Sequence, residues 1–226
     1  MEDVKTINLR GVNCFLLKSG EGFILIDTGL PARRAELERE LESAGCRPGD
    51  LRLVILTHGD YDHAGNGAYL REKYGVKIAM HHVDSPMVER GDEASNRKDR
   101  PDRVSPLGRI IIPIGKLMTT LCRMGKLETF KPDLCLDDGQ SLAEYGLDAR
   151  VLHLPGHSKG SIGVLTADGG LFCGDLLMNM RRPDAHFMID DLAGFHASIE
   201  KLKSPQIQMV YPGHGKPFPM SSLPPL

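Results

Sequence analysis

The chain has 226 residues, of which 41% are hydrophobic, and its 28 lysines and arginines nearly balance its 30 aspartates and glutamates. This length and composition suit one soluble globular domain, which we place at residues 1–226. The balanced charge argues against a nucleic-acid-binding protein, and no apolar run approaches the ~20 residues that a membrane-spanning helix needs.

The cysteines and the first residues favour a cytoplasmic location. The five cysteines are odd in number and form no CxxC pair, which is typical of reduced thiols. The first ten residues, MEDVKTINLR, have two acidic side chains directly after the methionine and lack the apolar core of a secretory signal.

The first quarter of the chain predicts strands followed by a helix and a further strand. Short apolar or alternating segments at 4–9, 12–17 and 22–27 predict strands. Residues 31–45 predict a helix, because a proline suits its first turn, a glycine suits its end and leucines share one face. The continuous apolar segment LRLVIL at 51–56 predicts a strand that is buried on both faces.

The middle of the chain departs from this alternation. A helix at 64–75 and a strand at 76–80 are followed by a charged, exposed loop at 91–105. Residues 107–126 are apolar with interspersed basic residues and predict a helix. Its first expected role is core packing or a dimer contact, followed by a lid over a pocket and then by docking on a membrane surface. We interpret residues 87–130 as a substrate-shaping insertion. The remaining segments predict strands near 146–153, 161–166 and 170–173, a helix near 191–203 and a final strand at 207–212.

Metal-ligating residue types gather where predicted strands end. The segment THGDYDHAG at 57–65 follows a strand directly, and three later segments, PGHSKGSIG, LFCGD and YPGHG, place one histidine or aspartate each in a similar setting. Any one of them alone is adequately explained as a cap or a turn. Together they supply seven nitrogen or oxygen ligands at four strand ends: His58, Asp60, Asp62, His63, His157, Asp175 and His214.

These motifs, in this order, resemble the metallo-β-lactamase superfamily of metallohydrolases. The family pattern T-H-x-H-x-D-H-x-G aligns with Thr57 to Gly65, and ILIDTG matches an early acidic motif at Asp27. The resemblance covers residues 4–218. It implies an α/β fold, a four-layer αβ/βα sandwich in which two mixed β-sheets pack face to face with helices outside.

The resemblance also implies a dinuclear centre. One ion would be held by His58, Asp60 and His157, and the other by Asp62, His63 and His214, with Asp175 and a water or hydroxide between them. Asp62 and Asp175 would serve catalysis, and Asp27 would support the metal loop without binding metal. Two divalent ions are expected, Zn²⁺ by family, with iron or manganese as alternatives.

Asp60 stands where the family pattern has a second histidine. A carboxylate is shorter and harder than an imidazole, which shifts preference towards iron or manganese. Its charge also leaves two divalent ions facing three carboxylates instead of two, which weakens them as Lewis acids. Flavodiiron reductases share the fold and place a carboxylate here, but this chain has no flavodoxin-like segment.

The resemblance implies a dinuclear hydrolase of a small ester, thioester or lactone that acts through a metal-bound hydroxide. Two alternatives remain open, namely an iron-dependent redox enzyme that reduces oxygen or oxidises persulfides, and a binding protein with degenerate metal sites. A homodimer through the insertion is a further possibility. His186 lies just after the Asp175 strand and could point into the pocket, as could Arg181 or Arg182, but all three are expected at the surface. Four other histidines are interpreted as structural: His81, His82, His153 and His196.

Overall fold

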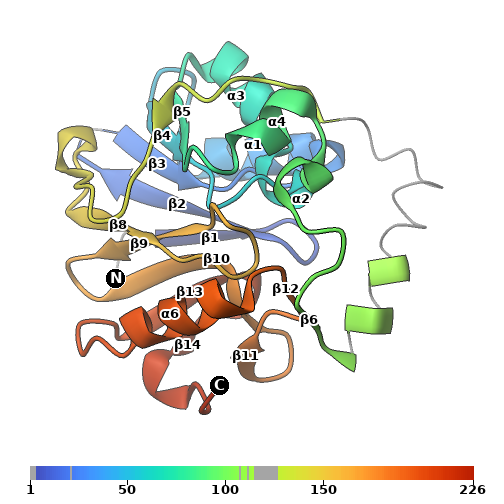
Figure 1. Cartoon of the computed structure of the whole chain (residues 1–226). Coiled ribbons are helices and arrows are strands. Elements are labelled where there is room, and N and C mark those ends of the chain that lie inside the picture. The colour runs from blue at the N-terminus through green and yellow to red at the C-terminus, as the bar shows by residue number, and fades with distance from the viewer. Residues whose placement is uncertain (1–3, 21, 107, 111, 115–126) are drawn as a thin grey trace.

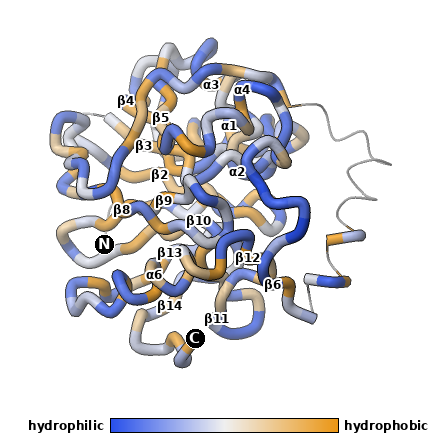
Figure 2. Tube along the Cα trace, viewed as in Figure 1, coloured by the Kyte–Doolittle hydropathy of each residue, from blue (hydrophilic) through white to orange (hydrophobic). Residues whose placement is uncertain are grey.

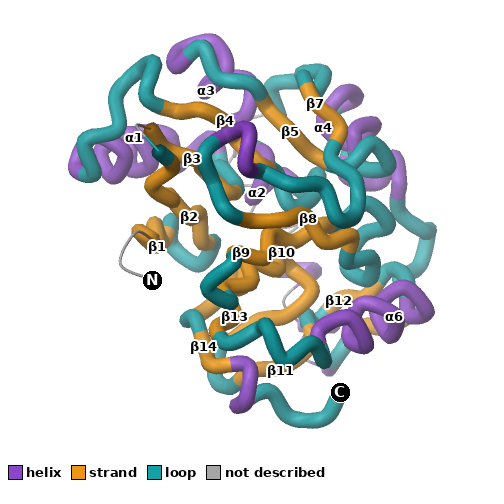
Figure 3. Tube along the Cα trace, turned by 90° about the vertical axis from the view of Figure 1, so that its left-hand side faces the viewer, coloured by secondary structure: helices purple, strands orange, loops and turns teal. Residues whose placement is uncertain are grey.

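The protein folds into four layers, helix–sheet–sheet–helix, as the family resemblance implied (Figure 1). The computed structural model describes residues 4–20, 22–106, 108–110, 112–114 and 127–226. In the view turned by 90°, the strands form the middle of the molecule, α1 and α3 lie outside one sheet, and α6 lies outside the other (Figure 3).

The first sheet is mixed and carries most of the N-terminal half. Its strand order is β1-β2-β3-β4-β5-β7, antiparallel across β1, β2 and β3 and parallel from β3 onward. Its strands are β1 (Val4–Asn8), β2 (Asn13–Ser19), β3 (Gly22–Ile26), β4 (Leu51–Ile55), β5 (Ile78–Met80) and β7 (Leu134–Cys135).

The second sheet is also mixed and carries the C-terminal half. Its order is β14-β13-β10-β9-β8, with β10 and β13 parallel and the other neighbours antiparallel, while β11 pairs with β10. Its strands are β8 (Ala149–His153), β9 (Ile162–Thr166), β10 (Gly170–Asn179), β11 (Pro183–Ala185), β13 (Met209–Gly215) and β14 (Phe218–Pro219).

The helices begin and end close to where the sequence predicted them. The predicted helix at 31–45 is a 3-10 turn followed by α1, and the one at 64–75 is α3, preceded by a short α2 inside the metal loop. The α-helices are α1 (Arg34–Ser43), α2 (Tyr61–Ala64), α3 (Gly67–Tyr74), α4 (Ser85–Arg90) and α6 (Leu192–Leu202). The 3-10 helices are η1 (Pro31–Arg33), η2 (Glu93–Asn96), η3 (Ala143–Tyr145) and η4 (Met220–Ser222).

Three buried clusters hold the layers together. Leucines of α1 and α3 pack on the outer face of the first sheet, and α6 packs in the same way on the second. Between the sheets, Phe15 of β2 meets Phe172 of β10 edge-on at 5.1 Å, and Tyr211 of β13 stacks on Phe172 at 4.7 Å. This packing clamps β10 and β13, which carry two of the predicted ligands.

The start of the insertion lies against the body of the protein. The hydrophilic segment that links α4 to β6 (Arg103–Val104) runs beside α2 (Figure 2), and β6 pairs with β12 (Met188–Ile189). Of the predicted helix at 107–126, residues 108–110 and 112–114 are helical, and the rest lies outside the described residues. Among the helices that the structure describes, none has the length and apolar character that crossing a bilayer requires.

Candidate metal centre

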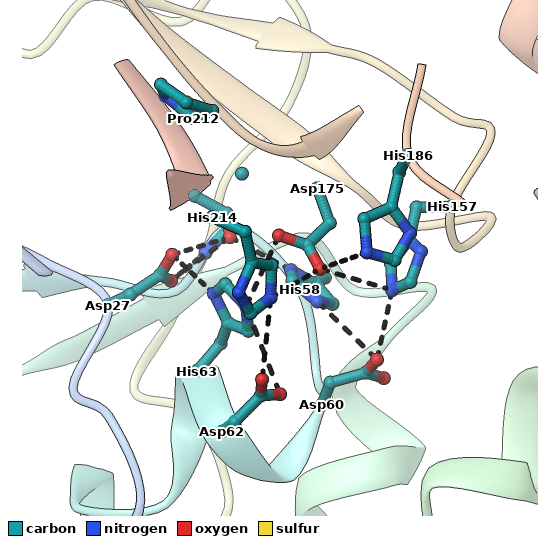
Figure 4. Close-up of polar contacts among 12 residues, drawn as sticks. Asp27, His58, Asp60, Asp62, His63, His157, Asp175, His186, Pro212 and His214 are labelled. Atoms are coloured by element: carbon teal, nitrogen blue, oxygen red, sulfur yellow. Dashed lines mark hydrogen bonds and ion pairs between the residues drawn. The ribbon is translucent and has the colours of Figure 1, made fainter. Parts of the chain in front are cut away.

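All seven predicted ligands converge at one edge of the sandwich, between the two sheets (Figure 4). The loop and α2 after β4 contribute four of them, and the turn between β8 and β9 contributes His157. Asp175 and His214 lie within β10 and β13, whereas the sequence had placed both just after a strand. The correction follows from the pairing, because the parallel β10–β13 ladder continues to Asn179 and Gly215 through irregular register.

Glycines let the backbones approach closely at this edge. Gly174 has a left-handed φ of 51°, in the stretch of β10 where the register with β13 shifts. A Cβ at Gly174 would lie 2.6 Å from the Thr57 hydroxyl, and one at Gly213 would lie 2.4 Å from Asp175 Oδ1. These positions therefore require glycine if Asp175 is to reach the metal loop.

In each of four histidines, Nδ1 points away from the centre and donates its proton to a nearby oxygen. These Nδ1 contacts are His58 with Thr57 Oγ1 at 2.9 Å, His63 with Asp27 Oδ2 at 2.9 Å, His157 with the Met188 carbonyl at 3.2 Å and His214 with the Gly11 carbonyl at 2.8 Å. The proton on Nδ1 leaves Nε2 of each ring as the atom that accepts a proton or a metal.

The Nε2 atoms and carboxylate oxygens face one another across short distances. On one side, Asp60 Oδ2 lies 3.0 Å from His157 Nε2 and 3.6 Å from His58 Nε2. On the other, His214 Nε2 lies 3.5 Å from Asp62 and 3.2 Å from Asp175, whose other oxygen lies 3.4 Å from His63 Nε2. Asp175 thus stands between the two groups.

Three of these converging atoms are buried and lack a hydrogen-bond partner among the described residues: His58 Nε2, His63 Nε2 and Asp175 Oδ1. Buried polar atoms without partners are costly, and acceptor atoms that face acceptor atoms need a cation between them. Imidazole and carboxylate donors are those that zinc, iron and manganese take. The residues present therefore fit a two-metal centre.

The electrostatics of the two sides differ. Burial works against the charged form of His63 and His214, but the Asp175 carboxylate, helped by Asp62, raises the pKa of both, that of His214 to about 9. Burial and the charge of Arg97 lower the pKa of His157. Without a metal, His63 and His214 therefore hold protons near neutral pH, whereas His157 presents a lone pair.

Asp27 supports the metal loop from behind, as the early acidic motif implied. Its carboxylate is 1% exposed and accepts hydrogen bonds from the Thr57 amide at 2.8 Å and the Thr57 hydroxyl at 2.8 Å, besides the one from His63. Its φ is 58°, a left-handed conformation that aspartate tolerates better than most residues. This shape turns the chain from β3 under the metal loop.

Asp60 has a partner that the sequence did not predict. Arg97, just after η2 in the insertion, donates from Nη2 to Asp60 Oδ1 at 2.5 Å and from Nη1 to the His157 carbonyl at 2.8 Å. The two side chains are only 11% and 14% exposed. Burial alone would raise the pKa of Asp60, but the charge of Arg97, with contributions from His58 and His157, holds it well below its usual range.

The surface placement expected for His186 is wrong. His186 is 4% exposed, its Nε2 lies 3.3 Å from Asp175 Oδ2 and has no hydrogen-bond partner in the described part of the chain, and its ring packs edge-on against His157 at 4.4 Å. The reason is that β11 folds back along β10, so that Ala185 pairs with Leu177 two residues from Asp175. Arg181 and Arg182 are exposed, as expected.

Comparison with known proteins places this geometry in a family. A family model described as the metallo-beta-lactamase superfamily matches residues 7–214. The chain is 29% identical over 212 residues to the Drosophila melanogaster protein "Beta-lactamase-like protein 2 homolog", covering 92% of this chain and 60% of that one. It is also 29% identical over 220 residues to the Bos taurus protein "Acyl-coenzyme A thioesterase MBLAC2", covering 91% and 74% respectively.

Solved structures share the fold. A metallo-beta-lactamase family protein from Thermus thermophilus superposes with a TM-score of 0.71 at 22% identity, over 97% of this chain and 75% of that one. At this identity the similarity shows the fold alone.

Proposed function

Because this chain belongs to the metallo-beta-lactamase superfamily, we propose that it is a dinuclear hydrolase of a small ester, thioester or lactone. The family and the thioesterase name of its bovine relative support a metal-dependent hydrolase as the class of enzyme. The observation that carries the dinuclear proposal is the convergence of four Nε2 atoms and three carboxylates, of which His58 Nε2, His63 Nε2 and Asp175 Oδ1 have no hydrogen-bond partner among the described residues.

The proposed ligand set follows the two sides of the centre. Asp60 Oδ2 and two imidazoles would hold the first ion, and Asp62 and two further imidazoles would hold the second, while Asp175 lies next to histidines of the second group and within 3.8 Å of His157 in the first. The imidazoles are His58 and His157 on the first side and His63 and His214 on the second. When bound, two divalent ions polarise a substrate carbonyl and lower the pKa of a water.

The protein's own residues orient the reactants. Asp62 is about one-third exposed, whereas Asp175 is 3% exposed. We therefore assign to Asp62 the hydrogen bond that orients an incoming water, and to Asp175 the fixed bridge that holds the two sides together. Asp27, Thr57 and Gly11 fix the histidine rings by holding their Nδ1 protons.

A thioester is the preferred substrate class within this proposal. The relative named an acyl-coenzyme A thioesterase matches over 91% of this chain, although the chain spans 60% of the length of the Drosophila relative and 74% of the bovine one. The insertion at 87–130 is proposed to shape the pocket, because its described part reaches Asp60 and pairs with β12 beside His186.

The test combines metal analysis with a substrate panel. Purified protein is assayed for zinc, iron and manganese per chain, and hydrolysis of acyl thioesters, lactones, aryl esters and phosphodiesters is measured with a His63→Ala variant as control. Two ions per chain and thioester hydrolysis that His63→Ala abolishes support the proposal. Hydrolysis that is equal in the variant, or full activity with one ion, contradicts it.

An iron-dependent redox enzyme is the second candidate, and the carboxylate of Asp60 among the ligands favours it. Iron as the native metal, with a visible absorption band and no hydrolysis of any panel member, would select it. A binding protein with degenerate sites would instead show metal that dialyses away.

We also propose a single domain at 1–226, small-molecule substrates and no nucleic-acid partner. A cytoplasmic location is supported by the cysteines that the structure describes, because all four are free thiols: Cys14, Cys46, Cys135 and Cys173. A homodimer through the insertion is supported by two exposed side chains in its described helical residues, Ile110 and Ile114.

A further inference from the structure

The Asp60–Arg97 pair raises a question of charge. An ordinary set of imidazoles at the first site would leave only Asp62 and Asp175 as anions, and Asp60 adds a third. Arg97 returns one positive charge, because its Nη2 lies 2.5 Å from Asp60 Oδ1 and 3.1 Å from His157 Nε2. Because a guanidinium stays protonated at all working pH values, this compensation is permanent.

The geometry points to Arg97 as a built-in counter-charge of the first metal site. Asp60 offers Oδ2 to the two imidazoles and Oδ1 to Arg97, so the pair together acts as a neutral ligand, as a histidine would. This inference rests on the proposed dinuclear site. It makes Arg97 a positioning residue of the metal centre, contributed by the insertion.

The surroundings of Arg97 show that it is held in place. Its Nη1 donates to the His157 carbonyl, and the neighbouring Lys98 amide donates to Asp190 at 3.1 Å. One residue earlier, Asn96 donates to the buried Asp84 at 2.8 Å, and Asp84 also accepts from Ser158 and Gly160 in the turn that carries His157. Glu93 accepts the Tyr61 amide of the metal loop at 2.6 Å.

These contacts tie the insertion to both metal-binding segments of the first site. A flexible surface arginine would lose its ion pair to solvent, but the side chains of this arginine and its carboxylate are only 11% and 14% exposed. The charge is therefore felt by an ion at the first site with little screening by water. Arg97 keeps Asp60 from making that site more anionic than one built from imidazoles.

The test measures zinc affinity of metal-free protein by competition with a chromophoric chelator. It separates the effect of the charge of Arg97 from the effect of its contacts that hold the insertion in place. Removing the cation in Arg97→Met leaves Asp60 uncompensated, so zinc should bind at the first site about tenfold tighter or more. Asp60→His should weaken it by a similar factor, because Arg97 then faces the metal without a carboxylate. The double variant Asp60→His/Arg97→Met should return to within about tenfold of the parent protein.

Arg100→Met is the matched control, because Arg100 is an exposed arginine three residues away. It removes the same net charge and should leave zinc affinity unchanged. If Arg97→Met binds zinc no tighter than the parent, or if Asp60→His alone binds zinc as tightly as the double variant, the counter-charge role is wrong. If the parent protein binds no zinc, or if His58→Ala binds as much zinc as the parent, the proposed dinuclear site is wrong, and this inference is wrong with it.

Discussion

Asp27 provides a sharp test of how the protein controls its histidines. In Asp27→Asn, one side-chain oxygen remains for the Thr57 amide, but the other is replaced by an NH₂ group that faces His63 Nδ1. To avoid two donors in contact, His63 must give up the proton on Nδ1, so that any proton it keeps lies on Nε2, the atom that points into the centre. Asparagine tolerates the left-handed φ of 58°, so the backbone is not perturbed.

The expected magnitude follows from these contacts. Loss of a group that orients a metal-binding histidine typically lowers metal affinity by about 10–100-fold, or about 1.4–2.7 kcal/mol. The metal-free protein should lose about 1.5–3 kcal/mol of unfolding free energy, because one charge-assisted hydrogen bond is lost. Asp27→Ala should lose about 1–2 kcal/mol more, since alanine disfavours a left-handed backbone.

Zinc titration of metal-free protein and urea unfolding measure the two quantities. Asp133→Asn is the control, because Asp133 accepts the Ile78 amide at 2.9 Å in a partly buried strand edge and contacts no histidine among the described residues. It should lower stability without changing metal affinity. If Asp27→Asn binds two zinc ions as tightly as the parent, Asp27 does not set the proton position of His63.

Three further predictions concern other parts of the centre and the core. His186→Asn should lower zinc affinity about tenfold, because it removes the imidazole beside Asp175. The control Arg182→Asn, on the exposed turn, should leave zinc affinity unchanged. If His186→Asn binds zinc as tightly as the parent protein, His186 lies outside the centre. The raised pKa values of His63 and of His214, the latter about 9, stabilise the metal-free fold fully below about pH 6.5, and this contribution is lost as pH rises through 9. Urea unfolding of metal-free protein at pH 6.5 and 9.5 should show the decrease in unfolding free energy. Zinc binding at pH 7 should release these protons, which calorimetry detects as a heat that depends on the buffer. Phe172→Ala should lower the unfolding free energy by about 3–5 kcal/mol, because the ring lies fully buried between Phe15 and Tyr211; a loss below about 1 kcal/mol in urea unfolding would contradict that packing.

The fold was predictable because its signals are local. Apolar segments of strand length, separated by turns, predicted β2, β3, β4 and β9, and the leucine face of α1 follows from its spacing. The metal loop was equally clear, since four ligands lie within six residues. Hydrophobic periodicity and ligand spacing of this kind involve only residues that are close in sequence, so the sequence alone reveals them.

The ends of β10 and β13 were less predictable. The sequence suggested that the strand before Asp175 ends at residue 173, but β10 runs to Asn179. Its extension depends on pairing with β13 and β11, which are distant in sequence, and on irregular register around Gly174. Strand length set by partners cannot be derived from the composition of one segment.

His186 illustrates a different limit. No motif contains it, and the neighbouring residues Arg181 and Arg182 are exposed, so a histidine in that segment was expected at the surface. Its burial arises because β11 turns back along β10 and brings it beside Asp175. Its position just after the Asp175 strand, eleven residues from Asp175, was the signal that it could point into the pocket, and this distance matches a hairpin return.

The effect of Asp60 also depends on a distant residue. Its position within the motif predicts an oxygen ligand, and by itself that ligand adds a negative charge and favours harder metals. The structure brings Arg97, 37 residues away, onto the same carboxylate, and in the proposed first site its charge offsets that of Asp60. If the proposed first site binds a metal, we therefore expect its preference for zinc or iron to depend on the pair. Ligand hardness remains as an argument for iron, whereas the charge argument no longer distinguishes this site from one with three imidazoles.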